Sequence, residues 1–334
     1  QILPEALSHR VFPPIRTVDL SKTNLRDHQQ QFVGRLKDLE NLSQMFGEGL
    51  RLITLTGEGG LGKTRLAERY GALHLHDFPG GVWLIDCSEA TDELGVFMQT
   101  LQALGSGASK QSGPRLNNQH DFRLAKEAIE SKGKALFIFD NLEQVIDKAS
   151  PALSSWLDET KDACFLVTSR EALKLERERV YRLDSLPIDD AVNLFTVRAQ
   201  LVRSDFKLGD DNRTCVEEIV RALDQLSLAI ELAAARMKML SLDSLSKKLS
   251  QRFRLLQSKQ RDTSSRHQTL RLAIEWSWDL LDPIEKWTLA QLSIFHDGFT
   301  LEAAEEAGRL AVRVRAEAVR AHRVDDDVEP LLHG

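Results

Sequence analysis

The sequence predicts an α/β fold in which helices cover both faces of a parallel sheet, with a helical region after it. Three observations carry this prediction. Short apolar, strand-like runs begin at about Leu52, Val82, Ala135 and Ala163, and runs with helical spacing separate them. A glycine-rich segment follows the first of these runs. Beyond Pro187 the strand-like runs stop and helical spacing continues.

The elements can be placed in order along the chain. Residues 1–31 are rich in proline and polar residues and are predicted to form a linker or extended arm. Residues 32–187 are predicted to form one nucleotide-binding domain, because strands and helices alternate throughout them. Its elements are a helix over 36–46, a strand over 52–56 with a helix after it, a strand over 81–88, helices over 94–104 and 119–130 with a surface loop over 105–115 between them, and strands over 135–139 and 163–170.

Residues 188–262 are predicted to form a helical domain. Within it, 227–240 reads as a helix whose first part is apolar on nearly every face, so it should be buried. Three further helices are expected from about Arg266 onward, the second beginning at Pro283. The tryptophans of this last part are expected in a core: Trp276, Trp278 and Trp287.

Composition limits the classes of function. The chain has 334 residues, enough for two or three compact units, with 42% hydrophobic and 28% charged residues. A net charge of -6 gives no general attraction to nucleic acid or to an anionic membrane, and no apolar run approaches the roughly 18 to 20 residues that span a bilayer. Scattered Cys87, Cys164 and Cys215 fit a reducing, cytoplasmic location, and a start at Gln1 fits a fragment.

The segment 57–64 reads G-x-x-x-x-G-K-T between a strand and a helix. Its glycines allow successive N–H groups to point at one anion, and the helix adds the positive end of its dipole. Lys63 would reach the outer phosphates, and the Thr64 hydroxyl would bind Mg2+. The alternative is a glycine-rich connection that binds nothing. The predicted binding residues here are Gly57, Gly59, Gly60, Leu61, Gly62, Lys63, Thr64 and Arg65.

A carboxylate follows the third strand. Asp140 ends the run 135–139, which places it at the carboxyl edge of the sheet, where open α/β sheets bind ligands. There it can hold the Mg2+ that Thr64 also binds. The alternative is a carboxylate that only caps a helix.

Arg170 follows the fourth strand. Its planar guanidinium could bind the terminal phosphate and so distinguish a triphosphate from a diphosphate. The alternative is a surface arginine that pairs with a carboxylate such as Glu171 or Glu176.

The motifs FVGR, GEGGLGKT, LFIFDNLEQV, FLVTSRE, LSLAIELAAAR and HQTLRLAIEWSWDLL occur in an order that resembles the bacterial STAND signalling ATPases, relatives of the NB-ARC switches. The resemblance covers about residues 30–307. It implies a P-loop domain, a helical domain and a winged-helix-like region over 263–334. It also implies that Val33, Gly34 and Arg35 lie on the adenine side and that Leu226 contacts the nucleotide. The strand that leads to Arg170 would lie between the strand that precedes the Lys63 loop and the strand that leads to Asp140.

The sequence departs from the family pattern in two places. Residues 225–228 read Gln-Leu-Ser-Leu where the family has Gly-Leu-Pro-Leu, so Ser227 replaces a proline and could cap the following helix. After Ala307 the leucine-rich continuation of a winged helix is missing, and five arginines lie between Arg309 and Arg323. A divergent C-terminus is expected there, with a basic helix as the alternative.

The residue after Asp140 bears on hydrolysis. Many fast P-loop ATPases have a second acid there, whereas this chain has Asn141, with Glu143 two residues later. An amide cannot accept a proton, so we expect at most slow ATP hydrolysis, with Lys63, Asp140, Glu143 and Arg170 as the catalytic residues. The resemblance implies an ATP/ADP switch that self-associates when ATP is bound.

Three other functions remain open. One is a P-loop ATPase with steady turnover, and another is a degenerate scaffold that binds partners without nucleotide. The third is a DNA-binding regulator that uses the winged-helix region, which the acidic composition does not favour. The larger relatives carry effector and sensor domains, so such domains or partner proteins are expected to act with this chain, away from any membrane.

Overall fold

A computed structural model describes residues 22–25, 32–105 and 118–257, together with 271, 274–275, 278, 281, 283–293, 295, 300 and 302–306. The contacts divide the chain into a unit of residues 1–270 and a unit of residues 271–334, and each is described by itself. The predicted loop over 105–115 falls outside the described residues except for its first residue. The tail after Ala307, Trp276 and most of the predicted arm over 1–31 also lie outside them.

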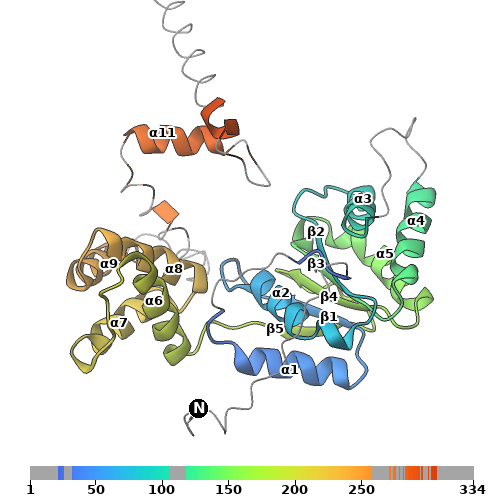
Figure 1. Cartoon of the computed structure of the whole chain (residues 1–334), viewed down its shortest axis with the longest axis horizontal. Coiled ribbons are helices and arrows are strands. Elements are labelled where there is room, and N and C mark those ends of the chain that lie inside the picture. Colours follow the sequence, from blue (N-terminus) through green and yellow to red (C-terminus); the bar gives the residue numbers. More distant parts are fainter. Residues whose placement is uncertain are drawn as a thin grey trace, which may run out of the picture. The chain divides into compact units, whose positions relative to one another are not determined.

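The first unit contains a five-stranded parallel sheet, which confirms the predicted fold class (Figure 1). The strand order is β2-β3-β4-β1-β5. The strand that precedes Arg170 therefore lies between the strand that precedes Lys63 and the strand that ends at Asp140, as the resemblance implied. The strands are β1 Leu52–Thr56, β2 Val82–Asp86, β3 Leu136–Asp140, β4 Cys164–Ser169 and β5 Arg179–Arg182.

Helices cover both faces of this sheet. One face carries the larger apolar core, in which Trp156 packs among Phe97, Phe122 and Phe139 from three other elements. On the opposite face Gly71 of α2 lies so close to β2 and β3 that any side chain there would meet them. The helices on the first face are α3 Glu93–Ala103, α4 Asn118–Ser131 and α5 Ile146–Glu159, and those on the second are α1 Leu36–Gly47 and α2 Lys63–Leu73.

Arg51, which precedes β1, forms hydrogen bonds with the end of α5. Its guanidinium donates to the carbonyl oxygens of Thr160 at 2.6 Å and Leu157 at 2.7 Å, which have no partner inside the helix. Replacing Arg51 with alanine is expected to lower the free energy of unfolding by about 2 kcal/mol, because two charge-assisted hydrogen bonds are lost. Urea unfolding would measure this.

A matched control is an arginine that pairs with an exposed residue of the same helix. Arg177 pairs with Asp158 at 2.7 Å, but both side chains are more than half exposed. Exposed ion pairs stabilise little, so Arg177→Ala should cost about 0.5 kcal/mol or less. Equal losses for the two arginine variants would contradict the capping role of Arg51.

Both edges of the sheet show contacts that the sequence did not predict. Strand β5 pairs with β1, although three of its four residues are exposed and the segment carries no apolar run. At the other edge, Thr23 bridges Val82, and the Asn24 side chain exchanges two hydrogen bonds with the backbone of Leu84, at 2.7 and 2.8 Å. Residues 22–25 of the predicted arm therefore run along β2.

The predicted helical region begins directly after Pro187, and α8 starts at the predicted residue. Leu226, not Ser227, is the residue before α8, and no side chain caps that helix, so the expected capping by Ser227 is wrong. None of the described helices is both long and apolar enough to cross a bilayer. The elements here are α6 Ile188–Val202, α7 Asp210–Ala222, α8 Ser227–Ala235, the 3-10 helix η5 Arg236–Lys238 and α9 Leu242–Gln257.

In the second unit, the helix predicted to begin at Pro283 is present as α11, Pro283–Leu292. None of its residues is buried. Trp287 is partly exposed and Trp278 is 42% exposed, so Trp278 is not the core residue that the sequence analysis expected.

Candidate functional site

The loop between β1 and α2 has the backbone that the glycine motif requires. Gly57, Gly60 and Gly62 have φ angles of 149°, 82° and 89°. A Cβ at Gly57 would lie 2.9 Å from the carbonyl oxygen of Leu183, so a side chain is excluded there. The chain can therefore turn tightly at the carboxyl end of the buried strand β1 and enter α2 at Lys63.

Lys63 folds back over this loop. Its Nζ donates to the carbonyl oxygens of Gly57 at 2.8 Å and Glu58 at 3.1 Å. Burial lowers the pKa of Lys63, and the charge of Arg170 acts in the same direction, whereas the carboxylates of Glu143 and Asp140 oppose them. The ammonium group therefore lies over the loop, within the field of the other predicted catalytic groups.

Asp140 joins three segments of the chain. It is 4% exposed. Its Oδ1 accepts hydrogen bonds from the hydroxyl of Thr64 at 2.7 Å and from the hydroxyl of Thr168, and its Oδ2 accepts from Nδ2 of Asn141 at 2.9 Å. Burial raises the pKa of Asp140, and the hydrogen bonds from Thr168 and Thr64 work against that rise.

The Thr64 and Asp140 oxygens fit a magnesium ion. They lie 2.7 Å apart, close to the distance of about 3 Å between neighbouring oxygen ligands in an octahedral site. Within the part of the chain that the structure describes, no group of three or more His, Cys, Asp or Glu side chains could hold a metal alone.

Arg170 lies at the same edge and pairs with Glu143. Its Nε is 3.3 Å from Oε1 of Glu143, while 57% of the Arg170 side chain is exposed. Its ion-pair partner is thus Glu143 and not Glu171 or Glu176, the carboxylates of the surface alternative. The structure brings Lys63, Thr64, Asp140, Glu143 and Arg170 together from β1, β3, β4 and the segments after them.

The segment predicted to lie on the adenine side links distant parts of the protein through hydrogen bonds. The Arg35 side chain is 6% exposed and donates to the carbonyl oxygens of Asp184 at 2.7 Å and Leu61 at 3.0 Å. Its backbone N–H donates to Asp190 at 3.2 Å, and Gly34 packs against the same carboxylate. The Arg35 guanidinium thus links the phosphate loop to the approach to α6.

Helix α8 also contacts the phosphate loop. The N–H of Leu228 donates to the Gly60 carbonyl oxygen at 3.1 Å, and the Ser227 hydroxyl donates to that of Leu61 at 3.3 Å. One turn later Glu231 pairs with Arg65 of α2 and with Arg198 of α6.

The sequence analysis missed Glu231 and Arg198. Glu231 is the one charged residue in the otherwise apolar helix α8, which is the signal that could have identified it. Leu226, predicted to contact the nucleotide, is fully buried.

Thr168 had no predicted role beyond its polar position at a strand end. Its fully buried hydroxyl donates to Asp140 and accepts the backbone N–H of Asn141 at 3.0 Å. Thr168→Val keeps the shape but removes both bonds. We expect it to weaken Mg2+-dependent nucleotide binding about tenfold and to leave binding measured with EDTA unchanged, as calorimetry would show. Thr168→Ser should restore the Mg2+ dependence, and equal losses with and without Mg2+ would contradict this role.

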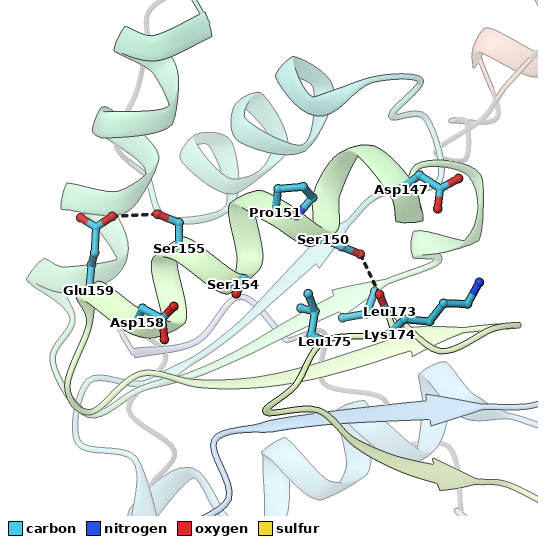
Figure 2. A pocket seen from close by; sticks show the side chains of 10 residues that line it. All are labelled: Asp147, Ser150, Pro151, Ser154, Ser155, Asp158, Glu159, Leu173, Lys174 and Leu175. Carbon is cyan, nitrogen blue, oxygen red and sulfur yellow. Dashed lines mark hydrogen bonds between the residues drawn. The ribbon is translucent and has the colours of Figure 1, made fainter.

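A separate groove of 760 Å3 lies between α5 and the loop after β4 (Figure 2). None of the predicted site residues lines it. Two of its acidic residues are already paired, Asp158 with Arg177 and Glu159 with Lys126. The groove is therefore distinct from the phosphate loop.

Comparisons with known proteins agree with this geometry. Residues 47–175 match the family model of an AAA domain. The chain is 34% identical over 303 residues to the uncharacterised protein Rv0894 of Mycobacterium tuberculosis, across 90% of this chain and 75% of that protein. It also resembles the crystal structure of a STAND protein with a tetratricopeptide repeat sensor, PH0952 of Pyrococcus horikoshii. This chain contains a P-loop NTPase domain.

The coverage of the other relatives shows how this P-loop NTPase relates to longer proteins. It matches PH0952 with a TM-score of 0.53 and 20% identity over 88% of its own length, and that likeness shows the fold. It is 35% identical over 255 residues to Rv0890c of M. tuberculosis, which has the provisional name of an HTH-type transcriptional regulator. The chain spans 38% of the PH0952 chain and 28% of Rv0890c.

Proposed function

We propose that this P-loop NTPase is a STAND-class ATP/ADP-binding switch of a regulatory protein, which hydrolyses ATP slowly and self-associates when ATP is bound. One observation carries the proposal. Asp140 is hydrogen-bonded to Thr64 of the phosphate loop and to Thr168 of β4, beside Lys63 and Arg170. Such a group of side chains at the carboxyl edge of a parallel sheet is the arrangement that binds nucleotide phosphates.

Different residues of the site would bind different phosphate groups of the nucleotide. The loop N–H groups and Lys63 would hold the inner and outer phosphates, and Arg170 would bind the terminal phosphate. Mg2+, held by Thr64 and Asp140, would neutralise phosphate charge. Val33, Gly34, Arg35 and Leu226 would shape the base side of the site by packing and by the backbone contacts of Arg35, in keeping with the resemblance.

Slow hydrolysis follows from the residue after Asp140. The Asn141 side chain donates to Asp140 Oδ2 at 2.9 Å, so it acts as a hydrogen-bond donor to the metal-binding carboxylate. An amide cannot accept a proton from water. Glu143 is a nearby carboxylate that could order water, and it is paired with Arg170.

A switch needs energy from more than one contact. Reversing a 99-fold population ratio takes about 5.5 kcal/mol, whereas one arginine–phosphate contact contributes about 1.5 to 3. The hydrogen bonds from α8 to the phosphate loop could supply the remaining free energy. A nucleotide that changes the shape of the loop would also change these bonds. We also propose that the domains divide between residues 187 and 188 and between residues 262 and 263. The switch would act in the cytoplasm, together with effector or sensor domains or with partner proteins.

Titration calorimetry with ADP, ATP and GTP in Mg2+, combined with light scattering, tests the proposal. We expect micromolar binding of ADP and ATP, about 8 kcal/mol, weaker binding of GTP, and a larger mass with ATP. Turnover of several ATP per second would favour a steady ATPase. A folded chain that binds no nucleotide would overturn the switch and favour a scaffold.

A further inference from the structure

Glu143 faces two cations at the nucleotide site. It lies in the 3-10 helix η4, Leu142–Gln144, directly after the turn at Asn141. Its Oε1 is 3.3 Å from Nε of Arg170, and its Oε2 is buried without a hydrogen-bond partner among the described residues. Lys63 lies in the field of both side chains, since Glu143 favours its charged form and Arg170 disfavours it. The carboxylate thus neutralises positive charge where a terminal phosphate would bring its own negative charge.

The position of Glu143 creates competition for Arg170. A guanidinium that binds a terminal phosphate must leave Glu143 or share itself between two anions, and like charges at one cation oppose each other. The shorter phosphate chain of ADP lacks the group that would compete. Because the Arg170 side chain is 57% exposed, solvent moderates this effect, which should amount to a severalfold change in affinity.

We infer that Glu143 is a specificity-determining residue that holds Arg170 in the absence of a terminal phosphate and so lowers the affinity for ATP relative to ADP. This role rests on the proposed switch function. Losing this residue would affect ATP affinity differently from losing a base that activates water. Loss of a base slows hydrolysis and leaves the ratio of ATP to ADP affinity unchanged, whereas loss of the residue that holds Arg170 raises that ratio.

The test uses Glu143→Gln, which keeps the size of the side chain but removes its charge. Titrations of the whole chain with ADP and with a non-hydrolysable ATP analogue in Mg2+ give the two affinities. We expect the analogue to bind about fivefold more tightly and ADP to change less than twofold. In an Arg170→Ala background the same substitution should have no effect on the ratio, because the competing cation is gone.

Glu171→Gln is the matched control, since it removes the same charge from the residue beside Arg170 and should leave the ratio unchanged. An unchanged or lower affinity of Glu143→Gln for the analogue, with ADP binding intact, would overturn the inference. An equal gain in the Arg170→Ala background would overturn it as well. A folded wild-type chain that binds neither nucleotide would refute the proposed function itself, which is a different result from a wrong role for Glu143.

Discussion

Lys63→Ala is expected to weaken the binding of both ADP and ATP about 100-fold. The ammonium group lies over the phosphate loop, where its Nζ donates to the carbonyl oxygens of Gly57 and Glu58. In the proposed function it would donate to the phosphates, and the loss of those charge-assisted hydrogen bonds would cost roughly 3 kcal/mol of binding free energy. The free energy of unfolding should change by less than about 1 kcal/mol, because the side chain is a partly buried charge whose pKa burial already lowers. Calorimetric titration and urea unfolding of the same sample measure both quantities.

The control is Lys134→Ala. Lys134 is exposed and precedes β3, so it lies at the amino end of the sheet, opposite to the phosphate loop. It removes the same charge and should leave both nucleotide affinities within a factor of two. Binding that survives Lys63→Ala would show that the nucleotide lies elsewhere.

Trp156→Ala should have the largest effect on stability, a loss of about 4 kcal/mol in the free energy of unfolding. Trp156 is fully buried on α5, and its ring lies 5.5 Å from that of Phe97, 5.8 Å from Phe122 and 6.3 Å from Phe139. Truncation would leave a cavity between two helices and the sheet. Urea unfolding followed by circular dichroism would measure the loss.

Trp156→Phe separates packing from hydrogen bonding. The indole N–H is buried without a hydrogen-bond partner among the described residues, so phenylalanine gives up no such bond. We expect a cost below about 1.5 kcal/mol, as for other apolar replacements of similar shape. A cost for Trp156→Phe as large as that for Trp156→Ala would mean that the N–H has an important partner.

The sheet and most of the site could be predicted because their signals are local. Strands β1, β3 and β4 are buried and largely apolar runs, and each ends at or just before a residue that binds phosphate or metal in the proposal. A parallel sheet brings such strand ends to one edge, so Lys63, Asp140 and Arg170 could be grouped without knowing any distance. Their order in the sheet came from the resemblance and matches the structure.

Contacts made by single polar atoms between distant segments could not be predicted. Thr168 and Asp140 are 28 residues apart, and the ion pair of Arg65 with Glu231 spans 166 residues. Strand β5 was not predicted, because an edge strand that is held by backbone pairing to β1 needs no apolar run. The expectation for Trp278 failed because apolar spacing marks one face of a helix but does not show that another element covers it.

The hydrogen bond from Leu228 to Gly60 bears on how fast a bound nucleotide would be released. Two carbonyl groups of the phosphate loop are bonded to helix α8, and Arg65 in the next turn is bonded to Glu231. Any movement of the loop would therefore break or displace these contacts with α8. In the proposed switch, a displacement of α8 would therefore change the residence time of the nucleotide, so the rate of ADP release would report the position of a helix 166 residues away in the sequence.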